Sequence, residues 1–162
     1  MKVLEKISHI LNRFMIILAG IFLAAMILMT CMNIFSRLFW SPIKGTYELM
    51  GYFGAVVTAF ALSYTQLKKA HIAVDVLVGQ FSQKTQLILQ GFNCLVCTVF
   101  FSIAAWQINK LARTMWLTGE VTETLRIIYY PFTYGVALGC SLLALVLLVE
   151  FLKLVFASKG AH

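Results

Sequence analysis

Charged residues are scarce in this sequence. They make up 12% of its 162 residues, against roughly 25% in an ordinary soluble domain. The six acidic and thirteen basic residues are also bunched, which leaves four segments without any charge: residues 14–36, 49–67, 85–109 and 127–149. Each segment can cross a bilayer as a helix, for which about 20 apolar residues are needed. This pattern excludes a soluble globular protein and leaves no room for a soluble catalytic domain.

The charge-free segments predict an all-α integral membrane protein. We expect residues 1–162 to form one domain of four long transmembrane helices, with spans at about residues 14–39, 47–67, 85–112 and 127–156. The first apolar run exceeds the apolar core of a signal peptide, which has about 7–15 residues, so we expect it to be retained. Residues 70–81 mix polar with aliphatic side chains and are too few to span. We expect a short amphipathic interfacial helix there, between spans two and three.

Basic residues favour a cytoplasmic location for both termini. An even number of spans places both ends of the chain on one side of the membrane, together with eight of the thirteen basic residues, while five lie on the other side. Basic loops are retained in the cytoplasm. We therefore expect the loops that contain Gly45 and Gly119 on the outer side.

Histidine is too rare, and too poorly placed, for haem or metal binding. His9, His71 and His162 all lie outside the charge-free segments, so a haem within the helices would lack histidine ligands. His71 and Asp75 have the i, i+4 spacing of a ligand pair, but a metal site needs three or four ligands. We expect a local hydrogen bond that stabilises the interfacial segment, and no metal, cofactor or catalytic residue.

The four cysteines lie inside predicted spans rather than in loops, which argues against a disulfide framework. Cys94-x-x-Cys97 has the spacing of a redox motif, but a reactive thiolate must be accessible to its partners. We expect these residues to be small packing side chains. The other two cysteines are Cys31 and Cys140.

Small residues recur at every fourth position in the second and fourth spans. In lipid, such faces let helix backbones approach closely. Both faces could join the helices of this chain, or one could bind a second protein. Their members are Gly51, Ala55, Ala59 and Ser63 in the second span, and Gly135 and Gly139 in the fourth.

Asn33 and Arg37 lie one helical turn apart near the outer end of the first span. An arginine at this depth can extend its charged group to the interface. This anchoring alone accounts for the presence of Arg37 in the span. Alternatively, Arg37 pairs with Glu48 across the hairpin and Asn33 holds the guanidinium group.

The order and placement of these motifs resemble one family, the small membrane (Q) subunit of tripartite ATP-independent periplasmic (TRAP) transporters. The resemblance covers nearly the whole chain. Its motifs are Asn33-x-x-x-Arg37, Pro42-Ile-Lys-Gly-Thr-Tyr-Glu48, Lys69-Ala-His71-Ile-Ala-Val-Asp75 and Thr118-Gly119-Glu120-Val-Thr122.

The resemblance implies a multi-pass protein of the bacterial inner membrane that supports a larger transporter. Its partners would be a large multispan membrane (M) subunit, a periplasmic substrate-binding (P) protein and membrane lipid, with no nucleic acid. The complex would use sodium to import a small carboxylated solute, of C4-dicarboxylate or sialic acid type. The small subunit would act as a scaffold, and its outer face is a candidate dock for the binding protein.

Two other functions stay open. The first is a stand-alone four-helix exporter that works as a homo-oligomer, with Glu48 as its coupling carboxylate. The second is a membrane thiol enzyme that uses Cys94 and Cys97. Transporters bind substrates and ions near mid-membrane at charged or broken helices, which these spans lack. This absence favours the supporting role.

The distribution of basic residues makes the topology testable. In a background without the native cysteines, Gly45→Cys and Gly119→Cys should each react with an impermeant maleimide in intact spheroplasts, because both loops are expected on the periplasmic side. Ser158→Cys should stay unlabelled until the membrane is opened. Labelling of Ser158→Cys alone would show the inverted orientation.

Overall fold

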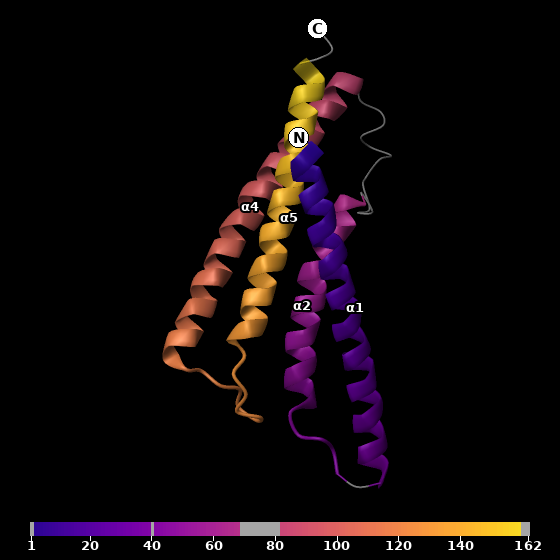
Figure 1. The fold of residues 1–162 in the computed structure, drawn as a ribbon, viewed down its shortest axis with the longest axis vertical. Coiled ribbons are helices and arrows are strands. Elements are labelled where there is room, and N and C mark those ends of the chain that lie inside the picture. The colour runs from indigo at the N-terminus through magenta and orange to yellow at the C-terminus, as the bar shows by residue number, and fades with distance from the viewer. Residues whose placement is uncertain (1, 40, 69–81, 160–162) are drawn as a thin grey trace.

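The computed structural model describes residues 2–39, 41–68 and 82–159, which form four helices joined by loops (Figure 1). Apart from one isolated pairing of Val121 with Ile128, these residues contain no β-structure. The predicted all-α class is confirmed for the described part of the chain. The helices are α1 (Lys2–Phe39), α2 (Thr46–Leu67), α4 (Gln83–Thr118) and α5 (Tyr130–Lys159).

Three of the four helices are long and apolar enough to cross a membrane: Ser8–Phe39, Thr85–Thr118 and Tyr130–Val155. The 22 residues of α2 would extend about 33 Å at 1.5 Å per residue, but its tyrosine, threonine and serine residues make it less apolar. That α2 spans the membrane stays a prediction. The expected interfacial helix, with His71 and Asp75, lies outside the described residues.

The helix ends differ from the predicted spans because charge does not terminate a helix. Helix α4 continues past residue 112 through Arg113 and ends where Gly119 adopts a left-handed conformation, with φ of 64°. At its other end, Ser82 caps α4 by accepting a hydrogen bond from the Thr85 amide. Helix α1 already begins at Lys2, well before its apolar segment. Helix α5 begins at Tyr130, because the residues before it belong to a hydrogen-bonded loop.

Figure 1 shows two helix pairs, α1 with α2 and α4 with α5, which separate towards the end that carries the 41–45 and 119–129 loops. Both termini lie towards the opposite end. Helix α4 packs on α5, α5 on α2, and α2 on α1, with a smaller contact between α1 and α5. In the apolar window of α5, 44% of residues are buried, against 6% in α1 and in α4. Helix α5 is therefore central, and α1 and α4 form the edges.

Close packing of α2 on α5 joins the two pairs. A Cβ atom added to Gly139 would lie 2.7 Å from the Ala59 Cβ and 2.8 Å from its carbonyl carbon. One added to Gly135 would lie 3.4 Å from a methyl group of Val56. The two small-residue faces therefore meet each other at Ala59 and Gly139, as expected if they join the helices of this chain.

Larger apolar side chains fill the space on both sides of this crossing. One buried cluster contains Ala19, Val56 and Phe60 and joins α1 to α2. The other joins α4 to α5. Its buried members are Cys94, Leu143 and Leu147.

Polar side chains also bridge helices, towards the end with the termini. The Ser63 hydroxyl of α2 donates to Oδ1 of Asn12 in α1, and both side chains are fully buried. The Asn12 amide donates in turn to the Ser8 carbonyl, at 2.9 Å. Further along, Gln66 of α2 donates to the carboxylate of Glu150 in α5, at 2.8 Å. Such bonds between membrane helices contribute about 0.6 kcal/mol on average, so here they add to the apolar packing.

The crossing of α2 and α5 predicts different effects for one substitution at two glycines. Gly139→Ala should lower stability by about 1–3 kcal/mol, the usual cost of overpacking, because the new methyl group meets backbone atoms of Ala59. Gly20→Ala should be neutral or stabilising by up to about 1 kcal/mol, since nothing lies within 4 Å of a Cβ there. Thermal unfolding midpoints in one detergent measure both. Equal shifts would contradict the close crossing.

Candidate functional site

The two loops at the open end of the helix pairs are held together by Glu48, in the first turn of α2. Its carboxylate accepts a hydrogen bond from the Thr124 amide at 2.8 Å and one from the Leu125 amide at 3.3 Å. Hydrogen bonds to an ionised acceptor are stronger than those between neutral groups. Glu48 thereby attaches the α4–α5 loop to the start of α2, and we call residues 41–48 and 119–129 the joined loops.

Leu125 reinforces this attachment by packing against Gly45. Gly45 has φ of 78°, a left-handed conformation that favours glycine. A Cβ atom there would lie 2.2 Å from the Leu125 side chain, so position 45 admits no side chain without movement of the loop. The labelling test of topology is therefore better made at Lys44 and Glu123, which are exposed.

The α4–α5 loop forms a small hairpin-like turn. The Thr122 amide donates to the Ile127 carbonyl at 3.0 Å, and the Arg126 amide to the Thr122 carbonyl at 3.1 Å. The Thr122 hydroxyl also accepts from the Ile127 amide. The backbone of the α4–α5 loop is therefore held in place by Thr122, which is buried.

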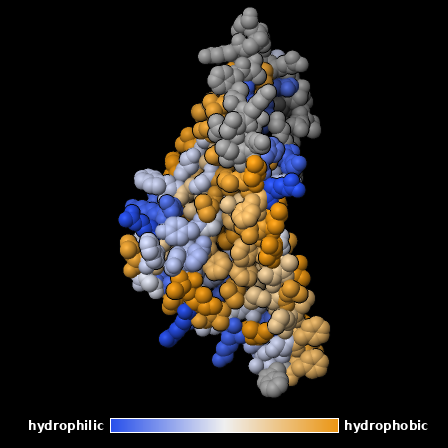
Figure 2. Space-filling model, in the orientation of Figure 1, coloured by the Kyte–Doolittle hydropathy of each residue, from blue (hydrophilic) through white to orange (hydrophobic). Residues whose placement is uncertain are grey.

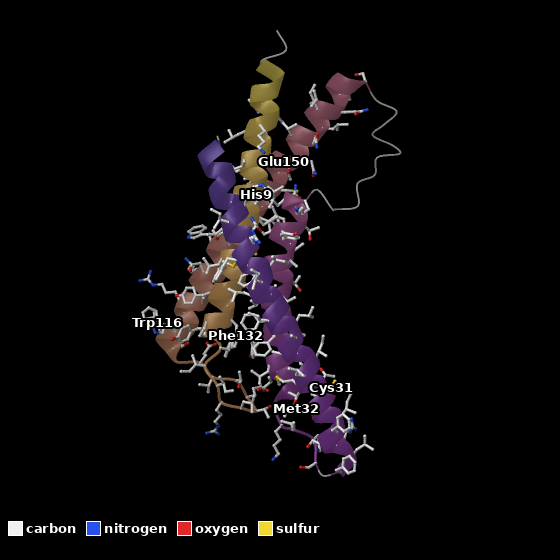
Figure 3. The ribbon with its side chains drawn as sticks, turned by 45° about the vertical axis from the view of Figure 1, so that its right-hand side comes forward. His9, Cys31, Met32, Trp116, Phe132 and Glu150 are labelled. Atoms are coloured by element: carbon white, nitrogen blue, oxygen red, sulfur yellow. The ribbon has the colours of Figure 1, made fainter. Side chains whose placement is uncertain are left out.

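Tyr129 ties the end of this turn to its beginning. Its hydroxyl donates to the Glu120 carboxylate at 2.7 Å, and this bond raises the pKa of Tyr129 because the phenol must stay protonated to donate. The Tyr129 ring stacks on Tyr52 of α2, with ring centroids 5.3 Å apart. Tyr52 also stacks on Phe132 of α5, at 5.8 Å. Aromatic packing thus supports the joined loops, and Figure 3 shows Phe132 near this end of the helices.

The first hairpin is closed by side chains of α1. The Ile43 amide donates to Oδ1 of Asn33 at 3.0 Å, and the Ser36 hydroxyl donates to the Ser41 carbonyl at 2.7 Å. Asn33 therefore holds loop backbone. Arg37 is exposed and makes no ion pair with Glu48 in the part of the chain that the structure describes. This geometry agrees with a simple anchoring role for Arg37.

The structure brings together only some of the residues singled out from the sequence. Glu48 binds the loop that begins with Gly119 and Glu120, but through Thr124 and Leu125, and Pro42 is exposed. In the small-residue faces, Gly51 and Ala55 are exposed, whereas the other members lie partly or fully inside the helix contacts. The interior members are Ala59, Ser63, Gly135 and Gly139.

Sequence reasoning missed the partners of Glu48. Thr124 and Leu125 lie more than 70 positions from it, and no local pattern indicates the contact. An acidic residue in the first turn of a helix usually interacts with that helix's own N-terminus. Leu125 gives no distinctive signal either, because the same loop contains the apolar residues Val121, Ile127 and Ile128.

The joined loops present a charged surface at this end of the molecule. Their exposed side chains carry charges of both signs, and no group of three or more His, Cys, Asp or Glu side chains occurs among the described residues. No disulfide joins the four cysteines, all of which lie in the described residues, and Cys94 is buried. The exposed charged residues at this end are Arg37, Lys44, Glu120, Glu123 and Arg126.

Comparison with known proteins identifies one family. The family model described as tripartite ATP-independent periplasmic transporters, DctQ component, matches residues 26–157, which include the joined loops. No curated protein and no solved structure was found to match the chain.

Removal of the Glu48 carboxylate should loosen the joined loops. Glu48→Ala leaves the Thr124 and Leu125 amides without their acceptor, so hydrogen exchange in peptides covering residues 119–129 should become faster. Glu123→Ala is the matched control, because Glu123 is an exposed acid of the same loop. Mass spectrometry in detergent measures the exchange. Equal rates in the two variants would show that Glu48 does not hold the loop.

Proposed function

Because the chain belongs to the DctQ component family of TRAP transporters, we propose that it is the small scaffold subunit of a sodium-coupled, binding-protein-dependent importer. Members of this family are components of TRAP transporters, so the chain is a transporter component that works with other TRAP components. We propose a small carboxylated solute, of C4-dicarboxylate or sialic acid type, as the substrate. We place the protein in the bacterial inner membrane as a single multi-pass domain, with both termini in the cytoplasm.

The observation that carries the scaffold role is the continuity of the helices. Positive φ angles occur in the described residues only at Gly45, Gly119 and Arg126, all in loops. Apart from residues 127–129, which belong to the α4–α5 loop, the four charge-free segments lie in helices without a break. Secondary transporters bind substrate and ions at discontinuous helices near mid-membrane. We therefore assign substrate and sodium binding to the large membrane subunit.

The exposed helix faces are suited to a large membrane partner. The edge helices α1 and α4 have few buried residues, and large apolar side chains such as Phe14, Ile21 and Phe100 are exposed along them. On α2, exposed Gly51 and Ala55 leave room for the backbone of another helix to approach. These faces support a role in which the chain packs against the large subunit.

The joined loops are our candidate dock for the periplasmic binding protein. Glu48 and Leu125 make the two loops one unit, so their exposed charges occupy defined positions. A preorganised surface loses less conformational entropy when a partner binds. The expected topology places this surface in the periplasm, where the binding protein is found.

A stand-alone exporter gains no support from the position of Glu48. Both carboxylate oxygens accept backbone hydrogen bonds from the α4–α5 loop. A coupling carboxylate has to exchange protons or ions during each transport cycle, whereas this one stabilises a loop.

Reconstitution tests the scaffold role. In liposomes with an inward sodium gradient, the purified chain alone should take up neither a C4-dicarboxylate nor sialic acid. Addition of the large subunit, with the binding protein outside, should produce uptake of the cognate solute, because the binding elements lie on those partners. Radiolabelled solute measures both. Uptake by the chain alone would overturn the scaffold role, and uptake by the complex with sodium replaced by potassium would contradict sodium coupling only.

A further inference from the structure

A groove of about 650 Å³ lies between α4 and α5. This volume is in the range of binding sites for small molecules, roughly 300–1,000 Å³. Trp106, at its edge, is 67% exposed, so the groove is open on one side. Both helices are apolar enough to cross a membrane, and the groove therefore opens towards lipid. Its floor is made of small side chains, including Ala105, Ala137 and Ala144.

Three polar groups in the groove have no hydrogen-bond partner among the described residues: the Asn109 carboxamide, the Trp106 indole N–H and the Tyr134 hydroxyl. The two serines of the groove differ, because Ser102 and Ser141 donate to carbonyl groups of their own helices at 2.7 and 2.8 Å. A polar group facing hydrocarbon without a partner is unfavourable. The three groups are therefore suited to a ligand with hydrogen-bonding atoms.

Positive charge lies beside these groups. Arg113 follows Asn109 by four residues on α4, which places the two side chains on the same helix face one turn apart. Arg113 and the neighbouring Lys110 are exposed. Figure 2 shows hydrophilic side chains gathered at the edge of the molecule formed by α4, beside largely apolar surface. The charge favours an anion at this end of the groove.

Aromatic side chains indicate the depth of this end in the membrane. Trp116 contacts Tyr130, with ring centroids 6.4 Å apart, and Tyr130 contacts Tyr134 at 6.2 Å. Figure 3 shows Trp116 at the loop end of α4. Trp and Tyr are enriched where the membrane meets water. The groove thus runs from the lipid headgroup level, at Tyr134, towards the middle of the membrane, at Ala144.

We propose that this groove binds one anionic phospholipid from the leaflet next to the 119–129 loop. The phosphate group lies at Arg113, Asn109 and Tyr134, and an acyl chain occupies the alanine floor. A transmembrane helix of a partner is a poorer occupant, since its backbone groups are satisfied internally and it offers no phosphate to Arg113. The site would stabilise the α4–α5 edge of the subunit, and it depends on neither the transported solute nor the coupling ion.

Native mass spectrometry of the purified full chain tests the site. With dioleoyl-phosphatidylglycerol added in detergent, the chain should retain one lipid at lower concentration than it retains dioleoyl-phosphatidylcholine. Arg113→Gln should weaken retention by about fivefold, the effect of one basic residue near an anionic lipid surface. Arg37→Gln is the matched control, because Arg37 is exposed at the loop end of α1, on the other helix pair. It should retain lipid like the unmodified chain.

A second variant separates the groove from general surface attraction. Ser141→Leu introduces bulk into the groove from an exposed position and should abolish retention while gel filtration shows an unchanged folded fraction. Equal losses in Arg113→Gln and Arg37→Gln, or equal retention of the two lipids, would overturn the proposal. Release of the large subunit by Ser141→Leu, with lipid retention unchanged, would overturn it in favour of a protein contact.

Discussion

The close contact of Gly139 in α5 with Ala59 in α2 is the constraint on which the rest of the structure depends. It is the point where the two helix pairs meet, and the absence of a side chain at position 139 allows backbone to approach backbone. In lipid there is little hydrophobic drive between helices, so dispersion contacts at such crossings supply much of the attraction. Beyond this crossing, α5 also packs on α4, and α2 packs on α1. The edge helices stay largely uncovered as a result.

The crossing of α2 and α5 affects the end of the molecule that carries the 41–45 and 119–129 loops. The helix pairs separate there (Figure 1), and the α4–α5 loop reaches the start of α2, where Glu48 and Gly45 hold it. The two loops therefore form one surface, and the rings of Tyr52 and Phe132 stack beneath it between α2 and α5. For a subunit of a TRAP transporter, this arrangement combines a structured loop end with wide exposed apolar faces on the edge helices.

Two polar residues singled out in the sequence bind partners other than those considered for them. Asn33 was expected to hold a guanidinium group if Arg37 paired with Glu48, but it binds the backbone of Ile43. Glu48 was a candidate for pairing or coupling, and it binds the amides of Thr124 and Leu125. In both cases the polar side chain accepts hydrogen bonds from backbone amides of a loop, which lack the carbonyl partners that a helix would supply.

The sequence by itself predicted four apolar helices, because charge is costly in hydrocarbon and its absence marks such segments directly. Its motifs carried the resemblance to the family, and the family model matches residues 26–157. The ends of two helices were not fixed by this absence of charge, since the predicted spans of residues 85–112 and 127–156 were drawn from charge, whereas α4 ends before Gly119 and α5 begins at Tyr130. Only the tertiary structure decided that Ala59 and Ser63 of the α2 small-residue face are internal while Gly51 and Ala55 are exposed. In a membrane, the surface and the interior are both apolar, so a residue such as Ala55 or Ala59 carries no mark of the side it faces. For a helix in lipid, the type of a residue indicates how deep it lies in the membrane. Which residues become its neighbours is decided only when the helices pack.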